Sequence, residues 1–245
     1  MQDSPEPAAL TAVRRRAESD PTVVGLLLTG SAARTGMATE HSDVDVYVVV
    51  AEPSPAWRTV HSPAIDVAVL TLDAVRSIPD DPTDWWGRYS YADARILLDR
   101  TDGELPALVR RQTTLTDAEV RRVLITYLDG WLNFAYRSLK SHRDGRPFEA
   151  TLDAVESLPW VLPVVFALHH RVRPYNKYLR WELARRPLDG GWIDGDTLVG
   201  LVERIVRDGD PGAQRALYAL VEPQARRAGF GDVVDAWGAE LSLFR

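Results

Sequence analysis

The chain has 245 residues, no cysteine and a formal net charge of −6 at pH 7. This length allows one large domain or two modest ones, and the lack of cysteine excludes disulfides and thiolate metal sites. The acidic balance without a Lys/Arg-rich tract disfavours a nucleic-acid partner, and the lack of an 18-residue apolar run or a basic leader predicts a cytoplasmic protein without a membrane span.

The first predicted elements are a helix and two strands. Residues 5–19 have the apolar spacing of an amphipathic helix, and residues 23–29 form a short apolar run between Pro21 and Gly30 that predicts a buried strand. Residues 43–50 read Asp-Val-Asp-Val-Tyr-Val-Val-Val, which predicts a second strand because polar and apolar positions alternate at its start.

The second predicted strand carries two carboxylates on one face. Side chains alternate along a strand, so Asp43, Asp45 and Tyr47 should share a face that is opposite to the valines. Asp43 and Asp45 would then lie about 6.6 Å apart at the backbone, from ~3.3 Å per residue. Such a pair is unfavourable without a cation or proton between the carboxylates, and hard oxygen ligands suit Mg²⁺ beside substrate phosphates.

A Gly-Ser turn precedes these carboxylates. Gly30 allows a tight turn and close approach of a ligand, and Ser31 offers a hydroxyl and an amide. Residues 32–34 are expected to open a helical turn whose N–H groups face an anion. A phosphate-binding turn beside a carboxylate pair is the equipment for handling a nucleoside triphosphate.

A third carboxylate lies in the next predicted strand, residues 64–70. Ile65, Val67 and Val69 alternate on one face, and Asp66 interrupts the apolar run on the other. A solvated edge strand would explain Asp43, but it would not explain why acids interrupt two separate valine-rich strands.

The pattern Gly30-Ser31, eleven residues, Asp43-x-Asp45 and a later Asp66 resembles the nucleotidyltransferase (polymerase-β-like) superfamily. The resemblance covers roughly residues 20–105, and Thr29 departs mildly from it because that position is usually apolar. It implies that Gly30 and Ser31 contact the triphosphate and that Asp43, Asp45 and Asp66 are catalytic metal ligands for two Mg²⁺ ions. Asp66 could alternatively be the general base.

The chain is expected to consist of an α/β (α+β) nucleotidyltransferase domain with a small mixed sheet, residues 1–112, and an all-helical bundle domain, residues 113–245. A last strand near residues 92–99 should close the first domain. Thr116 and Glu119 form a capping box that opens a helix to residue 140. Further helices are predicted for residues 148–171, kinked or divided at Pro159 and Pro163, and then for residues 175–185, 196–207, 211–228 and 232–244.

Lys177 is one of two lysines among 29 lysine and arginine residues. Lysine suits a role as a compact point charge beside a triphosphate, and the resemblance implies a basic residue of the helical domain in that place. Lys177 and Asn176 are therefore predicted nucleotide-binding residues; the alternative is a solvated helix start.

Three further features are weaker candidates for the site, and each has an alternative interpretation. Trp85 and Trp86 could frame an acceptor pocket or belong to the core. Asp84 could act as general base if Asp66 only binds metal. Arg34 could touch phosphate or lie on the surface.

Three functions are compatible with the sequence. The leading one is transfer of a nucleoside monophosphate, with ATP as donor substrate, to a hydroxyl of a small molecule, as in the aminoglycoside and lincosamide adenylyltransferases that the chain resembles. The second is modification of a partner protein, as by nucleotidyltransferase antitoxins. The third is a non-catalytic nucleotide-binding module, which the intact Asp-x-Asp disfavours.

Overall fold

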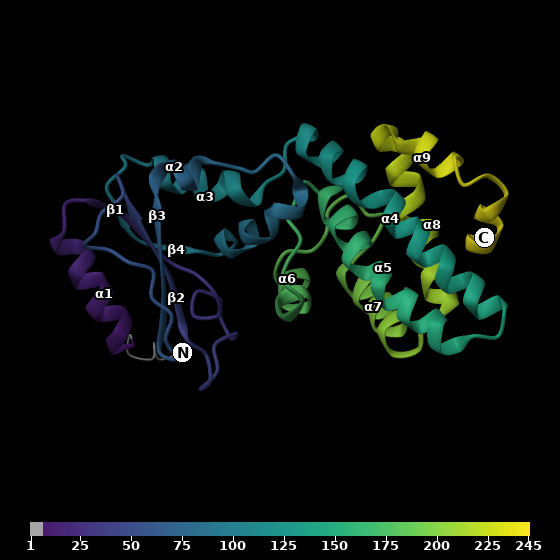
Figure 1. Ribbon diagram of the computed structural model, residues 1–245, viewed down its shortest axis with the longest axis horizontal. Coiled ribbons are helices and arrows are strands. Elements are labelled where there is room, and N and C mark those ends of the chain that lie inside the picture. The colour runs from purple at the N-terminus through teal and green to yellow at the C-terminus, as the bar shows by residue number, and fades with distance from the viewer. Residues whose placement is uncertain (1–6) are drawn as a thin grey trace. The chain divides into compact units, whose positions relative to one another are not determined.

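The computed structural model describes residues 7–245, and the start of the first predicted helix, residues 5–6, lies outside this range. The chain divides into two compact units, Met1–Thr113 and Thr114–Arg245. Figure 1 shows the helices and strands of both units.

The first unit contains a mixed four-stranded sheet in the order β3-β2-β1-β4. β1 pairs antiparallel with both β2 and β4, whereas β2 and β3 are parallel. The structure also forms helical segments that were not predicted, between β3 and β4 and after β4. The elements are α1 (Ala8–Ser19), β1 (Val23–Leu28), β2 (Val44–Val50), β3 (Ile65–Thr71), α2 (Leu72–Arg76), the 3-10 segment η1 (Pro82–Tyr91), β4 (Arg95–Asp99) and α3 (Glu104–Thr113).

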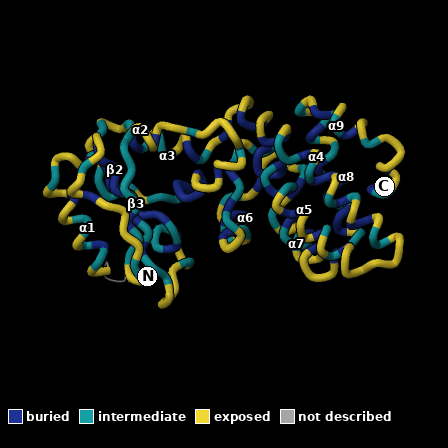
Figure 2. Tube along the Cα trace, in the orientation of Figure 1, coloured by how far each residue is buried: buried dark blue, intermediate teal, exposed yellow. Residues whose placement is uncertain are grey.

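The sheet has an apolar cluster on each face. On one face, Leu10 and Ala17 of α1 pack with alternate valines of β2 such as Val46. On the other face, Leu27 and Val49 pack with Val75, Tyr91 and Leu105 from α2, η1 and α3. Figure 1 shows α1 on one side of the sheet and α2 and α3 on the other. The buried residues follow the two central strands, whereas the connecting loops are largely exposed (Figure 2).

All named elements of the second unit are helical. The unit begins with a capping box: Thr116 accepts from the amide of Glu119, whose carboxylate accepts from the amide of Thr116. The elements are α4 (Asp117–Arg143), α5 (Pro147–Ala167), the 3-10 turn η2 (Asn176–Tyr178), α6 (Leu179–Arg185), α7 (Gly195–Asp208), α8 (Pro211–Ala225), the π-helical η3 (Arg226–Phe230), α9 (Gly231–Asp235) and the 3-10 segment η4 (Gly238–Phe244).

Helices α4 and α5 pack closely, with Trp160 of α5 against the backbone at Gly130 of α4. A Cβ on Gly130 would lie 2.3 Å from a ring carbon of Trp160. α5 is a single helix with Pro159 and Pro163 inside it, so the expected division at these prolines is wrong. A proline inside a helix costs about 3 kcal/mol, because it removes a backbone hydrogen bond and crowds the preceding turn. The free energy gained by burying α5 residues such as Val161 exceeds this cost.

The last predicted helices are also corrected. The segment expected as one helix over residues 232–244 is broken after Asp235, where α9 ends before η4 begins. α8 ends at Ala225, before the expected residue 228, and continues as the π-helical η3, in which Gly229 adopts φ 88°.

One described helix, α5, is long and apolar enough to cross a membrane by length and composition alone. Of its most apolar 18-residue window, 56% is buried, as is usual for a core helix. A single helix of this kind is weak evidence for a membrane span.

Candidate active site

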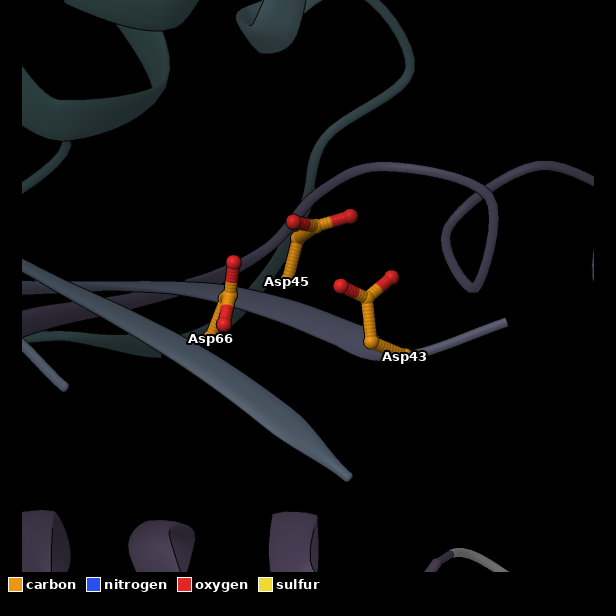
Figure 3. A group of neighbouring side chains, drawn as sticks. All are labelled: Asp43, Asp45 and Asp66. Carbon is orange, nitrogen blue, oxygen red and sulfur yellow. The ribbon is translucent and has the colours of Figure 1, made fainter. Parts of the chain in front are cut away.

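Three carboxylates converge at one end of the parallel pair β2 and β3. β2 begins at Val44, one residue later than expected, so Asp43 immediately precedes the strand. Asp45 is the second residue of β2. Asp66 is the register partner of Asp45 in β3. One oxygen from each of the three side chains lies within 4.8 Å of the others, and all three residues are half-buried (Figure 3).

The donor set of this cluster suits a divalent cation. Three carboxylates so close together repel one another unless positive charge or a proton lies between them. Hard, negatively charged oxygens are the ligands that Mg²⁺ takes in phosphate-handling sites, where it also retains water and binds phosphate oxygens. The partial exposure of the three residues leaves room for such additional ligands. The residues present therefore fit Mg²⁺.

The loop before β3 orients Asp66. The amide of Ser62 donates to Asp66 Oδ1 at 3.1 Å, and His61 Nδ1 lies 3.2 Å from Asp66 Oδ2. Ser62 also bonds both ways with the backbone of Ile65, which closes the loop. Asp43, by contrast, has no hydrogen-bond or ion-pair partner among residues 7–245. Sequence reasoning missed His61 and Ser62, because their only signal was proximity to Asp66 along the chain.

The Gly30 turn lies directly against the Asp45 carboxylate. Gly30 adopts φ +61°, and a Cβ built on it would lie 1.8 Å from Asp45 Oδ2. The amide of Thr29 donates to the Asp45 carbonyl at 2.8 Å, which ties the end of β1 to the same residue. Glycine is required at position 30 for two reasons: the backbone is left-handed there, and a side chain would overlap Asp45.

Ser31 follows in a run of turns and not in a helix, so the helical opening expected at residues 32–34 is wrong. The amide of Ala33 bonds to the Thr29 carbonyl and that of Arg34 to the Ser31 carbonyl, which uses these N–H groups inside the turn. Ser31 itself is 4% exposed, and its amide and hydroxyl have no hydrogen-bond partner in the described part of the chain. Ser31 therefore keeps the donors that an anion could use.

Arg34 is a buried residue of the fold, so the alternative of a surface arginine is wrong. Its guanidinium donates to the carbonyls of Gly30 at 2.7 Å, Ala92 at 2.6 Å and Tyr89 at 3.3 Å. It also lies 5.0 Å from the centroid of the Tyr89 ring. These contacts join the Gly30 turn to the C-terminal end of η1.

Tyr47 continues the face of β2 that carries Asp45. Its hydroxyl donates to Ser90 Oγ at 2.7 Å, and Ser90 donates to the Gly87 carbonyl. Burial raises the pKa of Tyr47, and the Asp45 charge adds to this while the Arg34 charge opposes it. Tyr47 therefore remains a neutral hydrogen-bond donor beside the carboxylates.

The tryptophan pair separates into two environments. Trp85 is buried, donates its indole N–H to the Pro79 carbonyl and lies under the guanidinium of Arg88 at 4.6 Å. Trp86 is 75% exposed. Trp85 is thus a core residue, which leaves only Trp86 with a surface that an acceptor could contact.

Asn176 and Lys177 belong to η2 of the second unit, and both are exposed. Asn176 Oδ1 accepts from the guanidinium of Arg173 at 2.7 Å, and burial lowers the pKa of Arg173. Lys177 Nζ lies 4.9 Å from the Tyr178 ring centroid. The roles predicted for Asn176 and Lys177 at a triphosphate stay predictions.

No family model and no curated protein sequence matches the chain. Among solved structures, it matches a nucleotidyltransferase-like protein from Exiguobacterium sibiricum at 14% identity and a TM-score of 0.48, over 93% of this chain and 77% of that one. The proposed function therefore rests on the chain's own residues.

Proposed function

We propose that the protein is a Mg²⁺-dependent nucleotidyltransferase that transfers a nucleoside monophosphate, AMP from ATP, to a hydroxyl of a small molecule. The observation that carries the proposal is the meeting of Asp43, Asp45 and Asp66 beside a glycine turn that touches Asp45. A metal-binding carboxylate set and an anion-facing turn at one place are the parts that phosphoryl-group chemistry requires.

Asp43 and Asp45 would hold Mg²⁺, with Asp66 as a further ligand. The ion would supply neutralisation of the charge that develops on the phosphates. Ser31 would bind the triphosphate through its amide and hydroxyl, which have no partner among the described residues. Gly30 keeps the backbone of this turn close to Asp45.

The transfer would proceed by in-line attack of the acceptor oxygen on the α-phosphorus. The new O–P bond forms as the bond between the α-phosphorus and the bridging oxygen breaks, and pyrophosphate leaves with that oxygen. Asp66 would accept or position the proton of the attacking hydroxyl, since Ser62 and His61 fix the direction of its carboxylate. Hydrogen-bonded ligands of this kind are held in a productive orientation before substrate arrives.

The remaining parts of the proposal come from the resemblance and from charge. ATP as donor and an aminoglycoside-like acceptor follow from the likeness to small-molecule adenylyltransferases. A chain of net charge −6 favours a cationic acceptor over a polyanion. Lys177 and Asn176 would bind the β- and γ-phosphates from the helical unit.

A transfer assay with labelled nucleotide tests the proposal. The full chain is incubated with α-labelled ATP, GTP, CTP or UTP, with Mg²⁺ or EDTA, and with a panel of hydroxylated amines. We expect label on an acceptor with ATP and Mg²⁺ and none with EDTA or with Asp45→Asn. Labelling of protein alone, or no labelling with any nucleotide and acceptor, would contradict transfer to a small molecule.

A further inference from the structure

Arg34 occupies an unusual position for an arginine, because it is 2% exposed and lies four residues after Gly30, the glycine in contact with Asp45. Burying a charged group is costly unless its donors are satisfied. Its two terminal nitrogens are committed to three backbone carbonyls, two of which are 55 and 58 residues away along the chain. Arg34 is therefore held in one orientation by two separate segments.

The carbonyl that Arg34 holds belongs to the residue in contact with Asp45. Gly30 has its carbonyl on the Arg34 guanidinium and its α-carbon close enough to Asp45 that a Cβ would overlap the carboxylate. A displacement of the Gly30 turn therefore changes the space available to Asp45.

The other end of the Arg34 contact fixes the η1 segment. The carbonyls of Tyr89 and Ala92 accept from Arg34, and Ser90 between them accepts from Tyr47 of β2. The Arg34 guanidinium and the Tyr47 hydroxyl thus connect the Gly30 turn, strand β2 and the end of η1. Arginine can do this because its planar fork offers several donors in fixed directions, which a lysine lacks.

We propose that Arg34 is a positioning residue of the metal site: it holds the Gly30 turn against Asp45, so that the carboxylates are preorganised for a divalent cation. This inference rests on the proposed function for the role of the cation in catalysis. Outer-shell groups that orient metal ligands typically account for about 10–100-fold in metal affinity or activity.

Arg88 provides a matched control within the same unit. It is also buried, at 3% exposed, donates to the backbone carbonyls of Gln112 and Arg111, and lies over an aromatic ring, that of Trp85. These contacts join η1 to α3, whereas those of Arg34 join η1 to the Gly30 turn. Loss of either guanidinium should destabilise the unit, but only loss of Arg34 should disturb the metal site.

The test measures binding of Mn²⁺ alone to the full-length protein by electron paramagnetic resonance. We expect Arg34→Met to bind Mn²⁺ about tenfold or more weakly than wild type, Arg34→Lys to lie between them, and Arg88→Met to bind like wild type. Amide hydrogen exchange should accelerate at residues 29–34 in Arg34→Met and not in Arg88→Met.

Wild-type affinity in Arg34→Met, or an equal loss in Arg88→Met, would overturn the positioning role. If Arg34→Met does not fold, the comparison is made with Arg34→Lys, which keeps the charge but loses the fork. In that case, unchanged Mn²⁺ binding overturns the proposal. Absence of Mn²⁺ binding by the wild type would instead overturn the metal site, and with it the proposed function.

Discussion

Asp45 and Asp66 are register partners in the parallel strands β2 and β3, so their side chains leave neighbouring strands at the same level. Asp45 is in contact with the Gly30 turn and Asp66 with the loop that ends at β3. The carboxylates of Asp45 and Asp66 are therefore positioned by two separate segments, the Gly30 turn and the loop before β3. Asp43 immediately precedes β2, and its carboxylate has no hydrogen-bond or ion-pair partner among residues 7–245.

The first prediction concerns the carboxylates. Asp43→Asn and Asp45→Asn should each lower the rate of nucleotidyl transfer at least about 100-fold, because metal-assisted charge stabilisation is worth several kcal/mol and about 1.4 kcal/mol is tenfold in rate. Circular dichroism should show an intact fold. Glu52→Gln, an exposed acid beyond the other end of β2, is the control and should retain full activity. Near-normal transfer by Asp43→Asn or Asp45→Asn would remove the metal assignment.

The second prediction separates two reasons for glycine at position 30. Gly30→Ala should lower the free energy of unfolding by about 1–3 kcal/mol through its positive φ, and should also weaken Mn²⁺ binding because the new methyl group displaces Asp45. Gly36 also has a positive φ, +77°, but a Cβ there meets no atom within 4 Å. Gly36→Ala should therefore lose stability through its positive φ alone and bind Mn²⁺ normally. Equal Mn²⁺ affinities in the two variants would show that the Gly30–Asp45 contact is unimportant for the site.

The third prediction concerns ligand-induced stability. A ligand that binds only the folded protein at 100 times its Kd stabilises it by about 2.7 kcal/mol, so ATP with Mg²⁺ should raise the melting temperature. EDTA should remove most of the shift, and Asp45→Asn should not show it. The measurement is differential scanning fluorimetry, repeated with each nucleoside triphosphate. A flat response to every nucleotide with Mg²⁺ and with Mn²⁺ would indicate a degenerate site.

The fourth prediction uses the two lysines of the chain as a pair. Lys177→Met should lower kcat substantially with a smaller change in nucleotide affinity, because a charge on the triphosphate matters most as pyrophosphate forms. Lys177→Arg should restore activity only in part. Lys140, exposed and 5.9 Å from the Tyr136 ring, has a similar setting, and Lys140→Met should turn over like wild type. A Lys177→Met enzyme as fast as Lys140→Met would make Lys177 a surface charge.

The fifth prediction concerns the packing of α4 on α5. Alanine normally stabilises a helix over glycine by about 0.8–1 kcal/mol, and Gly200→Ala in α7 should do so because no atom lies within 4 Å of its Cβ. Gly130→Ala should instead destabilise by about 1–3 kcal/mol, since its methyl group would overlap Trp160. Urea unfolding of both variants gives the comparison. A gain of stability in Gly130→Ala would show that Trp160 moves aside without cost.

The strands and the carboxylate cluster could be predicted because their signals are local. Alternation of apolar residues placed Asp45 and Asp66 on strands, and the Thr116 capping box marked the start of α4 within a few residues. The 3-10 segment η1 had no such signal. Its conformation depends on contacts with distant residues, such as those of Arg88 with the end of α3.

The burial of Arg34 could not be predicted either, because it depends on residues that are distant along the chain. An arginine after a Gly-Ser turn has no local feature that distinguishes a surface charge from a buried donor. Its partners Tyr89 and Ala92 are brought to it only when the sheet and η1 pack together. The continuity of α5 through Pro159 and Pro163 was likewise decided by tertiary packing, which outweighed the local preference of proline to end a helix.

The close contact between Gly30 and Asp45 also limits how long an acidic side chain can be at position 45. Aspartate already reaches the α-carbon of Gly30, so the additional methylene of a glutamate has no room on that side. The turn and the acid, fifteen residues apart in the sequence, are thus a single steric unit. A redesign of the site for a larger cation would have to rebuild the turn and the strand together.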